Sequence, residues 1–432
     1  MKFPANLVAV AIITAYLPVG AANWPEWRGP DGNHVTPEKN LPTEWSGTRN
    51  IRWKVALPDR GNSTPIVWGD HIFVTQAIEK ENRRTLMSFD REKGKLLWQS
   101  GTVFNEKEET HPENPYCAAS PVTDGKIVVA TFGSAGVFCY DFNGKELWKR
   151  DLGPQKHTWG NASSPILHGD LVILFHGPGT NSQLLAMNKM TGATVWKVML
   201  PEPVPGERTD GFAGKGPGVV GSFSTPTVVR AGQRDELIMS LPQFLKAFDP
   251  KSGRELWTCD GLNPLIYTSA IHGDGLVVGM GGFFGGTMAV KPGGSGDVTK
   301  THRVWHEQRS KKGRIGSGVV YEGHIYVQNQ DGMAECLELQ SGKTVWTERL
   351  RGAGAKSESW SSLVRSGDRL YAVNQSGDVF VLKASPKFEL IASNSVGEPS
   401  NSSLAVSNGE LFLRTHQSLW CIRDTKQTAS TR

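Results

Sequence analysis

The chain has 432 residues, 38% of them hydrophobic, which is enough to bury a large core, and its net charge of +5 is modest. Its basic residues are scattered, and the one local cluster, at residues 309–314, falls between repeat units, so we exclude nucleic acid as the main partner. The 49 glycines and 25 prolines fit many tight turns between short strands and argue against a helical protein.

Residues 1–22 are typical of an export signal. Lys2 supplies a positive start, residues 7–16 an apolar stretch, and residues 19–21 a cleavage site of small residues. No segment reaches the roughly 20 apolar residues that a membrane helix needs, and no cysteine near the cleavage site offers a lipid anchor. We therefore expect a monomeric, periplasmic or secreted protein without a membrane anchor, whose mature chain begins at Ala22 or Asn23.

A repeat with a period of roughly 40 to 60 residues runs down the rest of the chain. Each unit begins with small residues such as Ser63-Thr64-Pro65, continues through a hairpin turn and short apolar strands, and ends near a Gly-Lys pair and a tryptophan. The eight units start at residues 63, 119, 163, 224, 268, 316, 361 and 402. This spacing predicts an all-β, eight-bladed β-propeller of four-stranded antiparallel blades over residues 51–424, after an N-terminal extension at residues 23–50.

The tryptophan that closes a unit is expected to fill the gap that widens between neighbouring blades toward the rim. A buried indole N–H needs a hydrogen-bond acceptor, which a neighbouring backbone carbonyl can supply. Blade seven has Leu390 or Ile391 instead. The expected docking tryptophans are Trp53, Trp98, Trp148, Trp196, Trp257, Trp305 and Trp346.

The last unit lacks an outer strand, because a polar tail follows residues 419–422. Residues 51–55 have the outer-strand pattern but precede the first unit. We therefore expect this N-terminal strand to complete the eighth blade, which closes the ring without an open edge. The tail at residues 425–432 is expected to be disordered.

Three of the five cysteines, Cys139, Cys336 and Cys421, fall at one repeat position that alanine occupies in other units. We expect these three to be buried free thiols that act as small apolar side chains. Export permits disulfides, and a bond between Cys117 and Cys259 stays open.

Residues that precede each unit are expected to surround one mouth of the central channel. They are rich in aromatic, amide and arginine side chains, which suit sugars, planar cofactors or peptides; the alternative is that they pack the longer loops. No catalytic or metal-binding motif appears, so we assign neither kind of residue. The candidate ligand-binding residues are Arg60, Asn62, His111, Asn114, Tyr116, His157, Trp159, Asn161, Arg208, Asp210, Tyr267, Arg314, Trp360 and Asn401.

Segments such as residues 245–257 and 139–148 resemble the pyrroloquinoline quinone (PQQ)-like repeat, and the likeness covers roughly residues 45–424. The same repeat builds PQQ-dependent alcohol dehydrogenases and the eight-bladed, non-enzymatic assembly lipoprotein BamB. The opening residues 24–32 are similar to those of exported PQQ-like bacterial proteins.

The resemblance implies two functions. Dehydrogenases of this family hold PQQ between a tryptophan and a ring of two adjacent bonded cysteines, with Ca²⁺ on Glu and Asn and an Asp as base. This chain has no adjacent cysteine pair, although Trp159 resembles the tryptophan floor and Asn161 or Asp210 the polar groups. We therefore expect an exported, non-enzymatic scaffold that binds a protein, peptide or glycan without a cofactor. The alternative is an alcohol or sugar dehydrogenase that uses PQQ and Ca²⁺ in an altered site.

Overall fold

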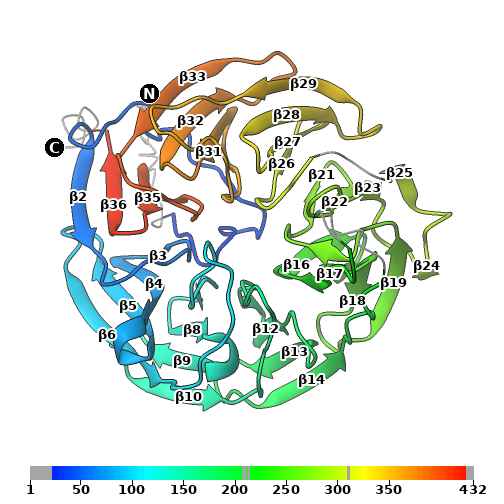
Figure 1. Cartoon of the computed structure of the whole chain (residues 1–432), viewed down its shortest axis with the longest axis horizontal. Coiled ribbons are helices and arrows are strands. Elements are labelled where there is room, and N and C mark those ends of the chain that lie inside the picture. The colour runs from blue at the N-terminus through cyan, green and yellow to red at the C-terminus, as the bar shows by residue number, and fades with distance from the viewer. Residues whose placement is uncertain (1–21, 207–211, 213–214, 309–311, 425–432) are drawn as a thin grey trace, which may run out of the picture.

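The computed structural model describes residues 22–206, 212, 215–308 and 312–424. The expected signal segment, the candidate residues Arg208 and Asp210, and the tail at 425–432 lie outside the described residues, except for Ala22. Eight four-stranded sheets are arranged in a ring, which confirms the predicted propeller (Figure 1). Among the described residues, no helix is both long and apolar enough to cross a membrane.

Each blade runs antiparallel from an inner to an outer strand. Blade 1 has β3 (Ile66–Trp68), β4 (His71–Ile78), β5 (Arg83–Asp90) and β6 (Leu96–Val103). Blade 2 has β7 (Val122–Thr123), β8 (Ile127–Thr131), β9 (Val137–Asp141) and β10 (Glu146–Arg150). Blade 3 has β11 (Ile166–His168), β12 (Leu171–His176), β13 (Gln183–Asn188) and β14 (Thr194–Met199). Blade 4 has β16 (Thr227–Ala231), β17 (Arg234–Leu241), β18 (Phe244–Phe248) and β19 (Glu255–Asp260).

The second half of the ring repeats this order. Blade 5 has β21 (Ile271–Gly273), β22 (Leu276–Met280), β23 (Thr287–Val290) and β25 (Arg303–Glu307). Blade 6 has β26 (Val319–Tyr321), β27 (His324–Gln328), β28 (Met333–Glu338) and β29 (Thr344–Arg349). Blade 7 has β30 (Val364–Ser366), β31 (Arg369–Val373), β32 (Asp378–Lys383) and β33 (Leu390–Ser395). Blade 8 has β34 (Ala405–Ser407), β35 (Glu410–Arg414), β36 (Ser418–Arg423) and β2 (Ile51–Ala56).

A few short elements lie outside this scheme. Three parallel pairings add β1 (Val35–Thr36) to β30, β24 (Gly296–Asp297) to β19, and β15 (Gly221–Ser222) to β20 (Leu265–Ile266). Two 3-10 turns are η1 (Glu79–Glu81) and η2 (Gly133–Ala135).

The chain ends close the ring as predicted, because β2 pairs antiparallel with β36 and places Trp53 opposite Cys421. A charged cluster reinforces this closure. The buried Glu410 carboxylate accepts a 2.5 Å hydrogen bond from Arg52 on β2 and a 2.9 Å bond from Arg91 of blade 1. The closing strand is therefore held by its sheet and by an ion pair to β35 of its own blade, and the same carboxylate joins blade 8 to blade 1.

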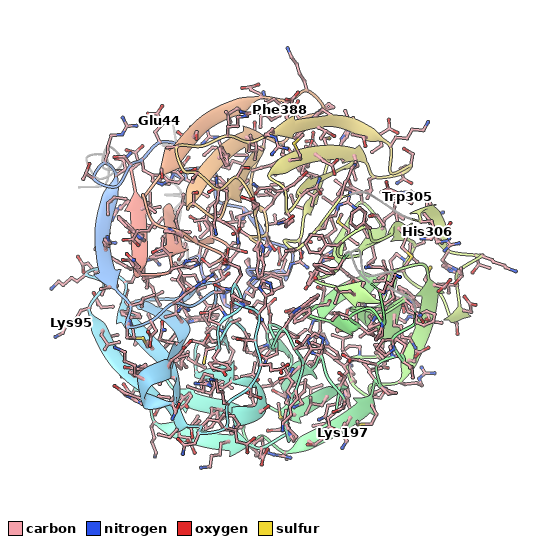
Figure 2. The ribbon with its side chains drawn as sticks, viewed as in Figure 1. Glu44, Lys95, Lys197, Trp305, His306 and Phe388 are labelled. Carbon is pink, nitrogen blue, oxygen red and sulfur yellow. The ribbon has the colours of Figure 1, made fainter. Side chains whose placement is uncertain are left out.

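Six outer-strand tryptophans join each blade to the next. Their indole N–H groups donate to backbone carbonyls of the following blade over 2.7–3.0 Å. Figure 2 shows Trp305 near the outer circumference of the ring, where the gap between blades is wide. The pairs are Trp53 with Arg91, Trp98 with Phe142, Trp148 with Lys189, Trp196 with Pro250, Trp305 with Leu339, and Trp346 with Ser385.

Trp257 differs from these six, because its indole N–H donates to the buried Glu236 carboxylate of its own blade over 2.8 Å. Glu236 also accepts the backbone N–H of Gly293 in blade 5 at 3.2 Å. A carboxylate therefore mediates the junction that a direct tryptophan–carbonyl bond makes elsewhere.

The strand register corrects one expectation about blade 7. In the other blades the tryptophan lies opposite a small third-strand residue, such as Ala186 opposite Trp196. In blade 7 the corresponding pair is Val381 and Ala392, so the residue in the tryptophan position is Ala392, and neither Leu390 nor Ile391. The latter two side chains are exposed, whereas Ala392 packs in a cluster with Trp45 of the N-terminal extension.

The cysteines occupy this same third-strand position in three blades, where Cys139, Cys336 and Cys421 lie opposite a tryptophan. All five cysteines are buried and free, so Cys117 and Cys259 form no disulfide.

Candidate functional site

The N-terminal extension closes one end of the central channel. In Figure 1 its dark-blue trace crosses the middle of the ring. Hydrogen bonds fix the segment to several blades, among them blades 1, 2, 5 and 7, on the face that carries the first hairpin turns. These bonds join Trp24 to Val67, Pro25 to Thr123, Arg28 to Ala270, Asn33 to His272 and His34 to Arg365.

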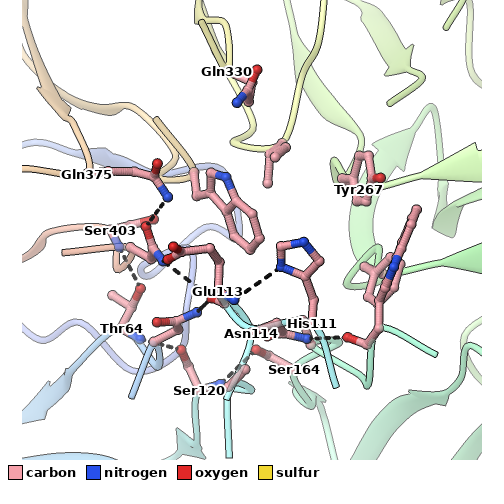
Figure 3. Close-up of a pocket in the computed structure, with 18 of the residues that line it drawn as sticks. Thr64, His111, Glu113, Asn114, Ser120, Ser164, Tyr267, Gln330, Gln375 and Ser403 are labelled. Carbon is pink, nitrogen blue, oxygen red and sulfur yellow. Dashed lines mark hydrogen bonds between the residues drawn. The ribbon is translucent and has the colours of Figure 1, made fainter. Parts of the chain in front are cut away.

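A cavity of about 350 Å³ opens at the other end, which we call the channel mouth. Trp27 of the extension lines the cavity, so the channel is a cup with a floor and not an open tube. Figure 3 shows much of the lining, which consists of Trp27, Asn62, Thr64, His111, Glu113, Asn114, Ala118, Ser120, Trp159, Ala162, Ser164, Phe212, Phe223, Tyr267, Phe283, Ile315, Gln330, Trp360, Gln375, Asn401 and Ser403.

The structure brings half of the predicted ligand-binding residues together around this cavity. They come from loops that precede six different blades, which meet only because the ring closes. These residues are Asn62, His111, Asn114, Trp159, Tyr267, Trp360 and Asn401.

The other described candidates lie behind the lining. Arg60 pairs with Glu113, and the Asn161 carbonyl accepts a 3.2 Å bond from Asn114. Tyr116 donates to the Glu108 carbonyl at 2.6 Å, and His157 packs edge-on against Phe223 with ring centres 5.4 Å apart. Arg314 is buried and pairs with Glu335 at 3.3 Å. For these residues the alternative prediction, packing of the loops, describes the contacts better.

The sequence interpretation missed the second set of loops at this mouth. Gln330, Gln375 and Phe283 lie in turns between the second and third strands of their blades. Because antiparallel strands alternate in direction, these turns emerge on the same face as the loops before each blade. The alternation of strand direction was therefore sufficient to predict that these three residues lie at the mouth.

A ring of hydroxyl groups lines the channel below the mouth. In each blade start the second residue is Ser or Thr, and its side-chain oxygen accepts the backbone N–H of the equivalent residue in the preceding blade. The eight bonds measure 2.8–3.1 Å and form a closed circle. The chain of acceptors is Ser120, Ser164, Thr225, Ser269, Ser317, Ser362, Ser403 and Thr64.

One wall of the cavity is polar and centres on Glu113. Partial burial alone would raise the pKa of the Glu113 carboxyl, but hydrogen bonding and charge from Arg60 outweigh it and hold this pKa below its usual value. Asn401 donates to the same carboxylate at 3.2 Å and accepts a 2.9 Å bond from Gln375. The one carboxylate of the described lining is therefore ionised and already paired.

The opposite wall is aromatic. The rings of Trp159 and Phe223 lie nearly parallel to Tyr267, with interplanar angles of 27° and 23°. Phe212 and Phe283 extend this wall, their ring centres 5.0 Å apart. Figure 3 shows Tyr267 across the cavity from Gln375 and Ser403.

His111 lies between the two walls as a neutral imidazole. Its Nδ1 accepts the backbone N–H of Glu113 at 3.1 Å, and partial burial lowers the pKa of the ring. Its ring centre is 5.5 Å from that of Trp360. His111 therefore positions the Glu113 loop and extends the aromatic surface.

The described residues do not fit PQQ and Ca²⁺. They contain no group of three His, Cys, Asp or Glu side chains placed to hold a metal ion, and Ca²⁺ prefers six to eight oxygens. PQQ carries three carboxylates, yet no Lys or Arg is among the lining residues that the structure describes. The nearby Arg60 and Lys356 both face Glu113.

The profile of the family described as outer membrane protein assembly factor BamB matches residues 39–157, 85–213 and 243–431. The chain belongs to this PQQ-like repeat family. No curated protein matches the sequence significantly.

Solved structures share the fold of this family member. BamB from Moraxella catarrhalis has a TM-score of 0.58 at 13% identity, over 86% of this chain and 97% of that chain. The computationally designed protein Ika8 has a TM-score of 0.57 at 10% identity, over 89% and 99%. Such low identities establish the architecture and leave function to the site.

Proposed function

We propose that this protein is an exported, non-enzymatic binding propeller that takes part of a protein, peptide or glycan into the cavity at the channel mouth. The observation that carries the proposal is the one-ended cup. A channel needs no floor to be stable, whereas a recessed aromatic cavity with a few polar groups is the usual form of a ligand site. Export is supported by the pattern of residues 1–22 and by membership of the BamB family.

The arrangement favours binding over catalysis. The Glu113 carboxylate is paired with Arg60, and the His111 Nδ1 is engaged by a backbone N–H. A general base needs a free site within hydrogen-bond reach of its substrate. The two titratable groups of the described lining that serve most often as bases are therefore occupied in holding the loop.

The test compares two adjacent phenylalanines. Phe283 lines the cavity, whereas Phe284 is exposed and does not. We expect peptides or saccharides to change the tryptophan fluorescence of the natural protein and of Phe284→Ala, and to bind Phe283→Ala more weakly. The proposal is wrong if no such probe binds, or if both variants bind equally well.

The dehydrogenase alternative has its own assay. Addition of PQQ and Ca²⁺, followed by dye reduction with an alcohol or sugar as substrate, would reveal an active cofactor site. Tight, Ca²⁺-dependent quenching of tryptophan fluorescence together with turnover would overturn the binding proposal.

A further inference from the structure

We infer that the cavity at the channel mouth recognises a neutral sugar unit, a mono- or disaccharide that is either free or the end of a glycan. This inference rests on the proposed binding function and narrows its ligand from three classes to one. Four properties of the cavity carry it: its division into two walls, its unused hydrogen-bonding groups, its charge and its size.

The two walls match the two surfaces of a sugar ring. A pyranose presents C–H bonds on its face and hydroxyl groups around its edge. The stacked rings of Trp159, Tyr267 and Phe223 form an apolar wall against which such a face can pack. Across the cavity from Tyr267 lies Gln375, and Asn401 also lines the cavity. Amide side chains both donate and accept hydrogen bonds, as hydroxyl groups require.

Several polar groups of the lining have no partner within the described residues. The buried Asn62 Oδ1 accepts no hydrogen bond, although the amide nitrogen of the same side chain donates to the Glu113 carbonyl at 2.7 Å. The side-chain amide of Gln330 also lines the cavity and makes no hydrogen bond in the part of the chain that is described. A buried polar atom without a partner is costly, so the Asn62 oxygen indicates a polar ligand that supplies one, and the Gln330 amide is available to the same ligand.

The tryptophans fall into two groups, one with and one without a hydrogen-bond acceptor for the indole N–H. The six tryptophans between blades all donate their indole N–H to a carbonyl, as Trp196 does to Pro250. Trp159 and Trp360, at the cavity, have no acceptor among the described residues. Their N–H groups are available to hydroxyl oxygens of a ligand.

Charge separates a neutral sugar from the other ligand classes. Glu113 is the one carboxylate among the described lining residues, and Arg60 neutralises it. An anionic or cationic ligand would enter this recessed site without an opposite charge among the described lining residues to meet it, which is unfavourable. An apolar peptide side chain would fill the aromatic wall but leave the amides unpaired.

Size is consistent with this class. A volume of about 350 Å³ lies near the lower end of the range for small-molecule sites. It suits one or two rings of a glycan end, with the remainder of the chain outside the mouth.

The experiment titrates the full exported chain with glucose, galactose, N-acetylglucosamine, maltose and cellobiose, and with neutral tripeptides that contain an aromatic residue. Binding is read by tryptophan fluorescence and by ligand-observed NMR. We expect at least one saccharide to bind, and Phe283→Ala and Gln330→Leu each to weaken it roughly tenfold, a typical loss for one well-placed contact. Phe284→Ala is the matched control and should leave affinity unchanged; thermal melts verify that each variant is folded.

Three results would overturn the inference. Tripeptide binding that depends on Phe283, without binding of any saccharide, would remove the sugar but leave the proposed binding function intact. Saccharide binding that Phe283→Ala and Gln330→Leu do not weaken would move the sugar to another surface. Absence of any binding would remove both proposals.

Discussion

Single residues explain why the repeat carries a Gly before its tryptophan. Trp196 rests on Gly253 in the turn of the next blade, where a Cβ atom would lie only 2.5 Å from the indole ring. Gly253 also has a φ of +72°, a conformation that favours glycine. The sequence shows the tryptophan and the glycine as neighbours in a pattern. In the structure the tryptophan of the preceding blade lies against the glycine in five blades, at Gly94, Gly144, Gly192, Gly253 and Gly342.

Trp196→Ala should therefore lower the free energy of unfolding by roughly 3 to 5 kcal/mol, the usual result of emptying a large buried aromatic site. The indole is almost fully buried and its N–H donates to Pro250 over 3.0 Å. Chemical denaturation measures the loss, with Met190→Ala, at an exposed side chain, as control. A loss below about 1 kcal/mol would contradict the docking role.

Two adjacent serines test the hydroxyl ring. Ser164 Oγ accepts the backbone N–H of Ser120 at 2.9 Å, whereas the buried Ser163 Oγ has no partner in the described chain. Ser164→Ala should cost about 1 to 3 kcal/mol because it leaves a buried N–H unpaired, and Ser163→Ala should cost much less. Equal losses in urea denaturation would show that the ring adds nothing to stability.

At the scale of elements, the closing strand was predictable and the channel floor was not. Residues 51–55 carry the apolar and tryptophan pattern of an outer strand, so their place in blade 8 follows from what the last unit lacks. Residues 24–34 have no strand or helix periodicity, and they are positioned by hydrogen bonds to several blades at once. These hydrogen bonds form only when the ring is closed, so no local sequence pattern predicts the position of the channel floor.

Deletion of residues 45–57 should open the ring between blades 8 and 1. It removes β2 and exposes the edge of β36, a strand that is otherwise paired on both sides. Exposed edges promote association between chains, so we expect aggregation and a lower melting temperature. Size-exclusion chromatography with light scattering measures this, with removal of residues 425–432 as control. A truncated chain that stays monomeric and equally stable would refute closure by β2.

For the whole molecule, the repeat was sufficient to predict the number of blades and the mouth of the channel at which the cavity lies. The spacing of the repeat depends on how the strands pack within a blade, and this packing is the same in every blade. The site instead depends on which loops converge, and residues such as Gln330 and Trp27 reach it from a turn and from the extension. Arg314, predicted at the mouth, is drawn into the wall of the channel by Glu335 and Thr287, because a buried cation needs partners.

The stability of the whole molecule should be greatest near pH 6.5. Burial lowers the pKa of His176 and of His272 to about 4. Between pH 4 and 6.5 the unfolded chain therefore binds more protons than the folded chain, and the free energy of unfolding falls as pH falls. His416, with its pKa also lowered to about 4 by burial, acts in the same direction.

Glu26, in the channel floor, makes the free energy of unfolding fall at alkaline pH. Burial raises the pKa of its carboxyl to about 8, against the opposing charge of Arg28 and with a further rise from Asp31. Between its unfolded pKa, about 4.5, and pH 8 the folded chain holds a proton that the unfolded chain releases, so the free energy of unfolding falls as pH rises. Above about pH 6.5 the histidines are neutral in both states and no longer offset this fall in the free energy of unfolding.

Urea denaturation across this pH range should show a maximum in the free energy of unfolding. Glu26→Gln should abolish the decline at alkaline pH, while the decline at acid pH persists. Persistence of the alkaline decline in Glu26→Gln would mean that this carboxyl is ionised within the folded ring.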